Sequence, residues 1–272
     1  MKIEKYNLEV YREAVKTCFE GPELIERGQK YRTWDTAQLT FDANESMLFN
    51  IPARKLNVRY AVEEFLWYVR ANKYDDSIEQ HATLWKKLQQ PDGSYFSNYG
   101  QYIFSKYTPD GINQFRFMFE QLARNPATRR AAIPLLKTEH CFHDNTDMVC
   151  TFGIQFFIRN DHLNMVINMR SNDVIWGLTN DAFCFWMIQR MMYLLLKAKT
   201  YPDLKMGVYV HNANTLHVYE RHYKMAQEII ATDISQITPI YVPMPSDVDV
   251  MSMLGKVTDH LEWTKFLDLL PS

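Results

Sequence analysis

The chain has 272 residues, of which 47% are hydrophobic and 23% are charged, and its formal net charge is -2. This length and apolar content favour a single domain over residues 1–272 with a sizeable core. The small net charge gives no reason to expect direct nucleic-acid binding, because proteins that bind the phosphate backbone are usually basic.

The four cysteines, Cys18, Cys141, Cys150 and Cys184, are scattered and form no CxxC pair. They indicate free thiols in a reducing cytoplasm rather than a disulfide framework. The first fifteen residues carry early acidic side chains and no long apolar core, so they do not predict a signal peptide. The longest apolar run, residues 191–196, is too short to span a membrane.

The first half of the chain predicts two helices, and a hairpin follows. Apolar residues recur at helical spacing over residues 7–20 and 58–72, and the second segment carries Glu64 beside its apolar face. Residues 152–169 contain two runs rich in Phe, Ile and Val around the polar stretch 159–162. This pattern predicts a β-hairpin with a turn at that stretch.

The second half predicts a long helix, then a strand and another helix. The long helix is capped by Thr179 or Asn180 and continues through Leu196. It is apolar on nearly all sides, so we expect it to be buried at the centre of the fold. Residues 205–210 predict a strand and residues 215–231 a helix, which makes the whole pattern mixed α+β. The Pro-rich end of the chain predicts no clear element.

Side chains suited to chemistry are concentrated between residues 150 and 181. Cys150 offers a thiol, which as thiolate suits attack on a pyrimidine ring. Arg170 and Ser171 suit an anion, because a guanidinium fork matches a phosphate and a hydroxyl adds a donor. Taken singly, these are an ordinary buried thiol and a solvated strand end. With the carboxylate of Asp181, the set indicates a nucleotide bound for covalent chemistry on its base.

The segment 150–181 resembles the core of the thymidylate synthase superfamily, and within it most resembles the phage deoxycytidylate hydroxymethylases. Other motifs match in family order from about residue 30 to residue 225. The resemblance implies an α+β, thymidylate synthase-like fold. In that fold a mixed β-sheet packs with helices around a long buried central helix, and a sheet face forms the dimer interface. The matching motifs are Glu64-Phe65-Leu66-Trp67-Tyr68, Leu84-Trp85, Ser97-Asn98-Tyr99-Gly100, Asn125-Pro126 through Arg129-Arg130, and Leu216-His217-Val218-Tyr219.

The resemblance implies three catalytic side chains, Cys150, Glu64 and Asp181, of which Asp181 also contacts the base. Cys150 is the nucleophile that adds to C6 of the base, and nearby guanidinium groups are expected to lower its pKa. Thr151 stands where ordinary thymidylate synthases carry His, and the hydroxymethylases also depart there. Glu64 is the carboxylate that organises water and moves protons around the base.

Two sets of residues, one from each chain of a dimer, are implied to bind the phosphate. Arg170 and Ser171, with Asn172 beside them, bind the nucleotide 5′-phosphate within one chain. Arg129 and Arg130 resemble the pair that reaches the phosphate in the partner's site, so a homodimer is implied.

One more phosphate contact and a sugar contact complete the implied nucleotide site. Arg32 resembles a residue of the family's mobile phosphate-binding loop, although this loop lacks the family's Gly-Thr-Gly pattern. His217 and Tyr219 resemble the pair that binds the sugar 3′-hydroxyl.

The implied co-substrate is 5,10-methylenetetrahydrofolate. Asp173 resembles the residue that hydrogen-bonds the pterin, Trp85 an aromatic beside the folate, and Tyr99 a tyrosine near the reacting carbon, with Gly177 in the same set. No metal is expected, because His217 and His222 lack a convincing third ligand.

Asp181 indicates which base is bound. It stands where thymidylate synthases have Asn, eleven residues after the arginine that binds phosphate. An amide matches O4 and N3–H of uracil, whereas a carboxylate accepts from the amino group and protonated N3 of cytosine. Asp181 has a structural alternative as a helix cap. A one-residue shift would make Asn180 the reader and uracil the base.

The sequence therefore predicts a deoxycytidylate 5-hydroxymethyltransferase, phage-borne and active in the host cytoplasm. A dCMP methyltransferase, a CMP hydroxymethylase and a thymidylate synthase remain alternatives on the same fold. A catalytically inactive relative that binds nucleotide or RNA is the alternative outside enzymes.

Overall fold

The computed structural model describes residues 6–105, 112–142 and 145–242, so most of the Pro-rich end lies outside the described residues. Its helices are α1 (Asn7–Glu20), α2 (Val58–Arg70), α3 (Trp85–Leu88), α4 (Gly100–Phe104), α5 (Gln114–Arg124), α6 (Gly177–Lys199) and α7 (Tyr223–Ala231). Its strands are β1 (Glu23–Glu26), β2 (Gln29–Asp42), β3 (Ala132–Pro134), β4 (Thr151–Arg159), β5 (His162–Met169), β6 (Asn172–Asp173) and β7 (Lys205–Tyr219).

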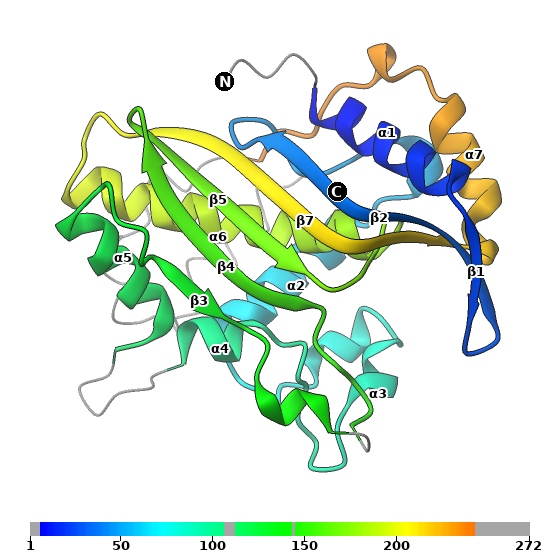
Figure 1. Cartoon of the computed structure of the whole chain (residues 1–272), viewed down its shortest axis with the longest axis horizontal. Helices are drawn as coiled ribbons and strands as arrows, with labels where there is room; N and C mark the ends of the chain where they lie inside the picture. The colour runs from blue at the N-terminus through cyan, green and yellow to red at the C-terminus, as the bar shows by residue number, and fades with distance from the viewer. Residues whose placement is uncertain (1–5, 106–111, 143–144, 243–272) are drawn as a thin grey trace.

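The strands form one mixed sheet in the order β1-β2-β7-β5-β4-β3, with β6 paired to β7 (Figure 1). β5 and β6 run parallel to β7, and the other neighbours are antiparallel. The predicted hairpin is confirmed as β4 and β5. Its turn residues Asn160 and Asp161 both have positive φ, 51° and 59°, which is the geometry of a tight two-residue hairpin turn.

Helix α6 is the long buried helix that the sequence predicts. Fifteen of its residues are buried, and Figure 1 shows it running behind β4, β5 and β7. The expected caps are wrong, because the helix begins at Gly177 and Thr179 lies inside it. The Thr179 hydroxyl donates to the carbonyls of Ile175 and Trp176. Instead, Asp173 Oδ1 accepts from the backbone of Ile175 (2.8 Å), so the chain turns into the helix earlier.

The predicted helix over residues 215–231 is wrong in its first part. β7 continues to Tyr219, and α7 begins only at Tyr223. Residues 215–219 include Thr, Val and Tyr, which fit a pleated surface, and they pair with residues 31–35 of β2. As a consequence, His217 and Tyr219 lie on a strand.

One side of the central strands is not covered by any described helix. α6 and α2 lie behind the sheet in Figure 1, and alternate side chains of β4, namely Ile154, Phe156 and Ile158, are buried. The other side carries a polar ladder. Gln38 Nε2 donates to Asn212 Oδ1 and Asn212 Nδ2 donates to Asn168 Oδ1, each at 3.0 Å. We call this side the open face.

The remaining expectations for helices are met. α1 and α2 match the predicted segments, and α2 begins after Asn57, whose side chain accepts from the backbone of Tyr60. It ends at Arg70, and the next residue, Ala71, has φ 53° and stops the helix. Within the described residues, none of the helices has the length and apolarity needed to cross a bilayer.

Candidate active site

Cys150 lies where β4 begins and β5 ends. Its backbone N–H donates to Tyr99 Oη (3.3 Å), and its carbonyl accepts from the backbone of Arg170 (2.8 Å). The Arg170 guanidinium donates to the carbonyls of Val149 (3.1 Å) and Met148 (2.6 Å). These bonds hold the thiol and the guanidinium side by side.

The pKa of the Cys150 thiol is raised to about 11. Burial is the main cause, Arg170 lowers the value, and the carboxylates of Asp181 and Asp147 raise it. As expected, the Arg170 guanidinium lowers the pKa, but burial outweighs this effect and the net value is raised. In the chain without substrate the thiol is therefore protonated at neutral pH.

Glu64 lies in the middle of a polar stripe on α2. Tyr60, Glu64 and Tyr68 are four residues apart, so they share one side of the helix. Glu64 is only 4% exposed, and its Oε1 accepts from Tyr68 Oη at 3.3 Å. Burial raises its pKa to about 7, while hydrogen bonds from Tyr60 and Tyr68 lower it. This carboxyl can therefore exchange a proton near neutral pH.

Aromatic side chains surround Glu64. Trp85 Nε1 donates to Tyr60 Oη at 3.1 Å, which ties Trp85 to the stripe on α2. The Tyr99 ring lies 5.5 Å from the Tyr68 ring, centroid to centroid. Tyr99 thus contacts both the Glu64 stripe and the backbone of Cys150, and the structure brings Trp85 and Tyr99 to the predicted site.

Asp181 on α6 faces the same interior. Its pKa lies well above the ordinary value because of burial, with a further contribution from the negative charge of Glu64, while a hydrogen bond from Asn172 lowers it. Asp181 is therefore close to Glu64 and also acts on the Cys150 thiol. For Asn180, the alternative base reader, the described part of the chain offers no side-chain hydrogen bond.

Asn172 is buried beneath Asp181. Its Nδ2 lies 3.0 Å from His211 Nε2, and His211 Nδ1 lies 2.6 Å from Tyr209 Oη. Neither His211 nor Tyr209 was singled out from the sequence. Their only signal is alternation along a strand, which does not distinguish a polar contact from core packing.

The residues predicted to bind phosphate and sugar meet at the edge formed by β6 and β7. Ser171 Oγ lies 3.5 Å from His217 Nδ1. The His217 and Tyr219 rings are 4.8 Å apart and perpendicular, and Tyr31 packs against both. Ser171, His217 and Tyr219 therefore form one surface next to Arg170.

A second cluster lies at the start of α6. Asp173 Oδ2 is 4.0 Å from His222 Nδ1, and Trp176 Nε1 donates to His222 Nε2. The Arg54 guanidinium stacks on Trp176 at 4.1 Å and is 1% exposed. Its Nη2 donates to Thr179 Oγ1 (2.6 Å) and the Tyr11 hydroxyl lies beside it, whereas Nε and Nη1 have no hydrogen bond of good geometry among the described residues. Buried donors of this kind need an explanation, and an ordered water or a bound group is one. Sequence reasoning missed Arg54, because Arg is usually a surface residue.

Three predicted arginines lie apart from Cys150. Arg129 and Arg130 are exposed between α5 and β3, as residues that act on a partner chain would be. Arg32 faces α1 and α7, with its guanidinium 4.9 Å from the Phe19 ring and 4.8 Å from the Tyr223 ring. The structure does not bring Arg32 to the predicted phosphate site.

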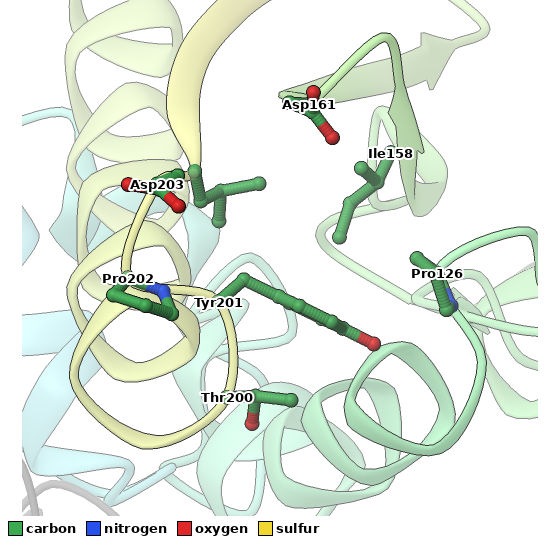
Figure 2. Close-up of a pocket in the computed structure, with 8 residues that line it drawn as sticks. Pro126, Ile158, Asp161, Thr200, Tyr201, Pro202 and Asp203 are labelled. Carbon is green, nitrogen blue, oxygen red and sulfur yellow. The ribbon is translucent and has the colours of Figure 1, made fainter.

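A cavity of about 250 Å³ lies far along the sheet from Cys150, at the β4–β5 turn (Figure 2). Tyr201 extends toward Pro126 across it and donates to the carbonyls of Leu122 and Ala123. The cavity shares no residue with the predicted site. Across the ranges that the structure describes, no group of three side chains is suited to hold a metal ion.

Comparison with known proteins places the chain in a family. The profile of the thymidylate synthase family matches residues 9–253. The chain is 29% identical over 198 residues to the deoxycytidylate 5-hydroxymethyltransferase of Enterobacteria phage T4, covering 71% of this chain and 78% of the relative. It is 25% identical over 193 residues to the thymidylate synthase of Bacillus mojavensis, covering 69% and 66% of the two chains. The chain therefore belongs to the thymidylate synthase family and has the α+β fold of that family.

Proposed function

We propose that this protein is a deoxycytidylate 5-hydroxymethyltransferase. The observation that carries the proposal is Asp181, a carboxylate that faces Glu64 and Cys150 and is held by Asn172. Burial favours the protonated form of Asp181, whereas a cytosine protonated at N3 would supply a positive partner that favours the carboxylate. The carboxylate only accepts hydrogen bonds, which suits the amino group and protonated N3 of cytosine and mismatches O4 of uracil. The similarity to the phage T4 hydroxymethyltransferase supports the same substrate.

Cys150 supplies the nucleophile. Its thiolate adds to C6 of the base, which makes C5 nucleophilic toward the one-carbon unit of methylenetetrahydrofolate. C5 bonds to that carbon, the C5 proton leaves, and cleavage of the bond between the carbon and the folate nitrogen releases tetrahydrofolate and leaves an exocyclic methylene. Because the negative charge of Asp181 raises the thiol pKa, pairing Asp181 with a protonated cytosine favours the thiolate when substrate is bound. The thiolate departs after water has added to the new exocyclic methylene, which leaves 5-hydroxymethyl-dCMP.

Glu64 directs the water and the protons. With a pKa of about 7 it can accept a proton from water and return it at neutral pH. The hydroxyls of Tyr60 and Tyr68 hold the carboxylate in place. In a thymidylate synthase a hydride takes the place of this water, and the similarity to those enzymes keeps that outcome as the second candidate.

The family's co-substrate, 5,10-methylenetetrahydrofolate, supplies the one-carbon unit. The residues at the start of α6 fit a planar pterin with an acidic tail. Asp173 and Gly177 would hold the pterin, with Trp85 and Trp176 as aromatic contacts. The unpartnered N–H groups of Arg54 would suit a carboxylate.

The phosphate is assigned to Arg170 and Ser171 of one chain and to Arg129 and Arg130 of a second chain. Arg170 uses Nε and Nη2 for backbone carbonyls, so Nη1 is free for a phosphate oxygen as far as the described chain shows. A homodimer through the open face is part of this proposal. The open face leaves room for it, because no described helix covers this side of the central strands.

A product assay tests the proposal directly. Purified protein is incubated with methylenetetrahydrofolate and dCMP, CMP or dUMP, and the mass of each nucleotide is measured. Gain of CH2O on dCMP is the expected result. Gain of CH2 with formation of dihydrofolate would make the protein a methyltransferase. Modification of CMP in place of dCMP would show that the substrate carries ribose rather than deoxyribose. Absence of product from every nucleotide would favour an inactive relative that only binds.

Asp181→Asn tests the base reading separately. An amide donates as well as accepts, so preference should move from dCMP toward dUMP. The readout is the ratio of kcat/KM for the two nucleotides. A dCMP preference that stays unchanged in the variant would assign base recognition to another residue.

A further inference from the structure

Three side chains, those of Asp173, Trp176 and His222, follow one another at the start of α6. Asp173 Oδ1 accepts from the backbone of Ile175 (2.8 Å), so Oδ2 is the carboxylate oxygen left for a ligand. His222 Nδ1 lies 4.0 Å from this Oδ2, and Trp176 Nε1 donates to His222 Nε2 at 2.9 Å. The proposed chemistry gives His222 no role, although each of its ring nitrogens faces a residue assigned to the pterin.

The indole of Trp176 fixes the position of the ring proton on His222. An indole N–H can only donate, so His222 Nε2 must accept and cannot carry a proton. Burial lowers the pKa of His222, so the ring is neutral and has one N–H. That N–H must be on Nδ1, the nitrogen that faces Asp173.

Trp176 is itself held in place from its other side. The Arg54 guanidinium stacks on the indole at 4.1 Å, and Arg54 Nη2 donates to Thr179 Oγ1 of α6 at 2.6 Å. The indole and the His222 ring meet edge to face, with their centroids 5.8 Å apart. These contacts keep the indole N–H directed at His222 Nε2.

The Nδ1 donor of His222 has no other acceptor in the described part of the chain. The atom is buried and makes no hydrogen bond there, and a buried donor is costly to leave unpaired. At 4.0 Å, Asp173 Oδ2 is beyond hydrogen-bond distance, and a movement of about 1 Å would close the bond. Hydrogen bonds of catalytic sites are often long without substrate and shorten when it binds.

We propose that His222, fixed by Trp176 as its Nδ1–H tautomer, is a positioning residue that holds the Asp173 carboxylate for the N–H groups of the pterin. The inference rests on the proposed function, since Asp173 is assigned there to the pterin. With the proton on Nδ1, Oδ2 receives one hydrogen bond from His222 and keeps a second lone pair for the co-substrate. An Nε2–H tautomer would instead present a lone pair to Oδ2 and repel the carboxylate.

The tautomer is measured first, on the protein without substrate. Two-bond ¹H–¹⁵N correlation spectra of protein labelled with ¹⁵N-histidine show which ring nitrogen carries the proton, and the signal that is missing from His222→Asn belongs to His222. A neutral ring with its proton on Nδ1 is expected at pH 7. An Nε2–H tautomer or a doubly protonated ring would overturn the proposal. This readout needs no ligand and no turnover, so it is independent of the proposed function.

Folate binding is measured second, by calorimetry with tetrahydrofolate and saturating dCMP, a mixture that has no one-carbon unit to transfer. His222→Gln places a carbonyl near the Nε2 position, where it accepts from Trp176, but offers no donor at the Nδ1 position. Its Kd for tetrahydrofolate should rise about 10-fold or more, the effect of losing a hydrogen bond to a charged group. His222→Asn has an N–H on an atom bonded to Cγ, as Nδ1 is, so its Kd should stay within about 3-fold.

The Kd for dCMP alone is the control, and it also shows that each variant is folded. It should stay within about 2-fold in both variants, because the side chain of His222 contacts Asp173 and Trp176. An unchanged Kd for tetrahydrofolate in His222→Gln would overturn the proposal. Equal increases in His222→Gln and His222→Asn would overturn it as well, because they would assign the effect to packing of the ring.

Failure of the proposed function has a different result. If tetrahydrofolate does not bind the unmodified protein in the presence of dCMP or of dUMP, the proposed function fails and the pterin role of His222 with it. The tautomer still decides the order of donors and acceptors between Trp176, His222 and Asp173.

Discussion

The interior around Cys150 and the outer edge that carries Arg129 and Arg130 differ in how their polar groups are satisfied. Inside, Glu64 and Asp181 are fixed by neighbours from the same chain. At the edge, the two arginines are exposed, and the nearby open face presents its polar ladder to solvent. The nucleophile and the proposed base reader are thus held within one chain, whereas the proposed phosphate site adds Arg129 and Arg130 of a second chain to Arg170 and Ser171.

The largest test of the interior is loss of the nucleophile. Cys150→Ala should reduce turnover by roughly 10⁴-fold or more, because a covalent step has no substitute once its nucleophile is removed. Product formation on dCMP and exchange of the C5 hydrogen are measured together. Cys141→Ala is the matched control, since this exposed cysteine lies outside the site and its loss should leave both rates unchanged. Retained C5 exchange in Cys150→Ala would assign the attack to another group.

Glu64→Gln tests the water-directing carboxyl and should reduce turnover about 10²- to 10⁴-fold. The pH dependence should change with it. If the charged carboxylate activates water, activity of the unmodified enzyme falls as pH drops through about 7, the raised pKa of Glu64. The activity of the Gln variant should not show this fall at low pH. The same limb in both proteins would assign it to a different group.

Glu64 also has a consequence for stability. Its pKa is higher in the folded chain than in the unfolded one, so the folded state binds more protons between about pH 4.5 and pH 7. Stability from this group is complete below its unfolded pKa and is lost as pH rises toward 7. Relative to the unmodified protein, Glu64→Gln should therefore raise the Tm at pH 8 and have little effect near pH 4.5. Thermal unfolding at both pH values checks this.

The outer edge is tested by mixing two inactive proteins. In a dimer with shared sites, Cys150→Ala and the double variant Arg129→Ala, Arg130→Ala each lack one component of the site. A heterodimer has one site in which both components are intact. With random exchange, an equal mixture should recover about one quarter of the unmodified activity. Recovery no greater than the sum of the separate proteins would mean that the sites are not shared.

The elements of the fold that the sequence predicts correctly are those with a local sequence pattern. Helix α2, the β4–β5 hairpin and buried α6 follow from periodicity and turn residues, which are local. The extension of β7 to Tyr219 was missed, because an apolar pattern with a few polar residues fits either a strand or a helix until its neighbour β2 is known.

The site residues divide in the same way, into those that a local sequence motif identifies and those that only their neighbours in space identify. Cys150, Glu64, Asp181 and the Arg170–Ser171 pair could be named because they lie in motifs with family spacing. Arg54 and His211 could not, because only their surroundings in three dimensions distinguish them: Arg54 has buried N–H groups over Trp176, and His211 contacts the Asn172 side chain. Arg32 is the opposite case. It was named from its motif, but its side chain packs against Phe19 and Tyr223 instead of the predicted phosphate site.

Arg32→Ala should have the smallest effect of these changes on the reaction. Its guanidinium donates to the Phe19 carbonyl (2.8 Å) and stacks between the rings of Phe19 and Tyr223, so it joins α1 to α7. Losing these contacts should lower the Tm while leaving the KM for dCMP within about 2-fold, since contacts of this kind contribute about 1 kcal/mol to folding. Arg170→Ala is the comparison, because loss of a charged hydrogen bond to phosphate should raise that KM about 10- to 100-fold. Equal KM increases in the two variants would return Arg32 to the phosphate site and imply that β2 rearranges when the nucleotide binds.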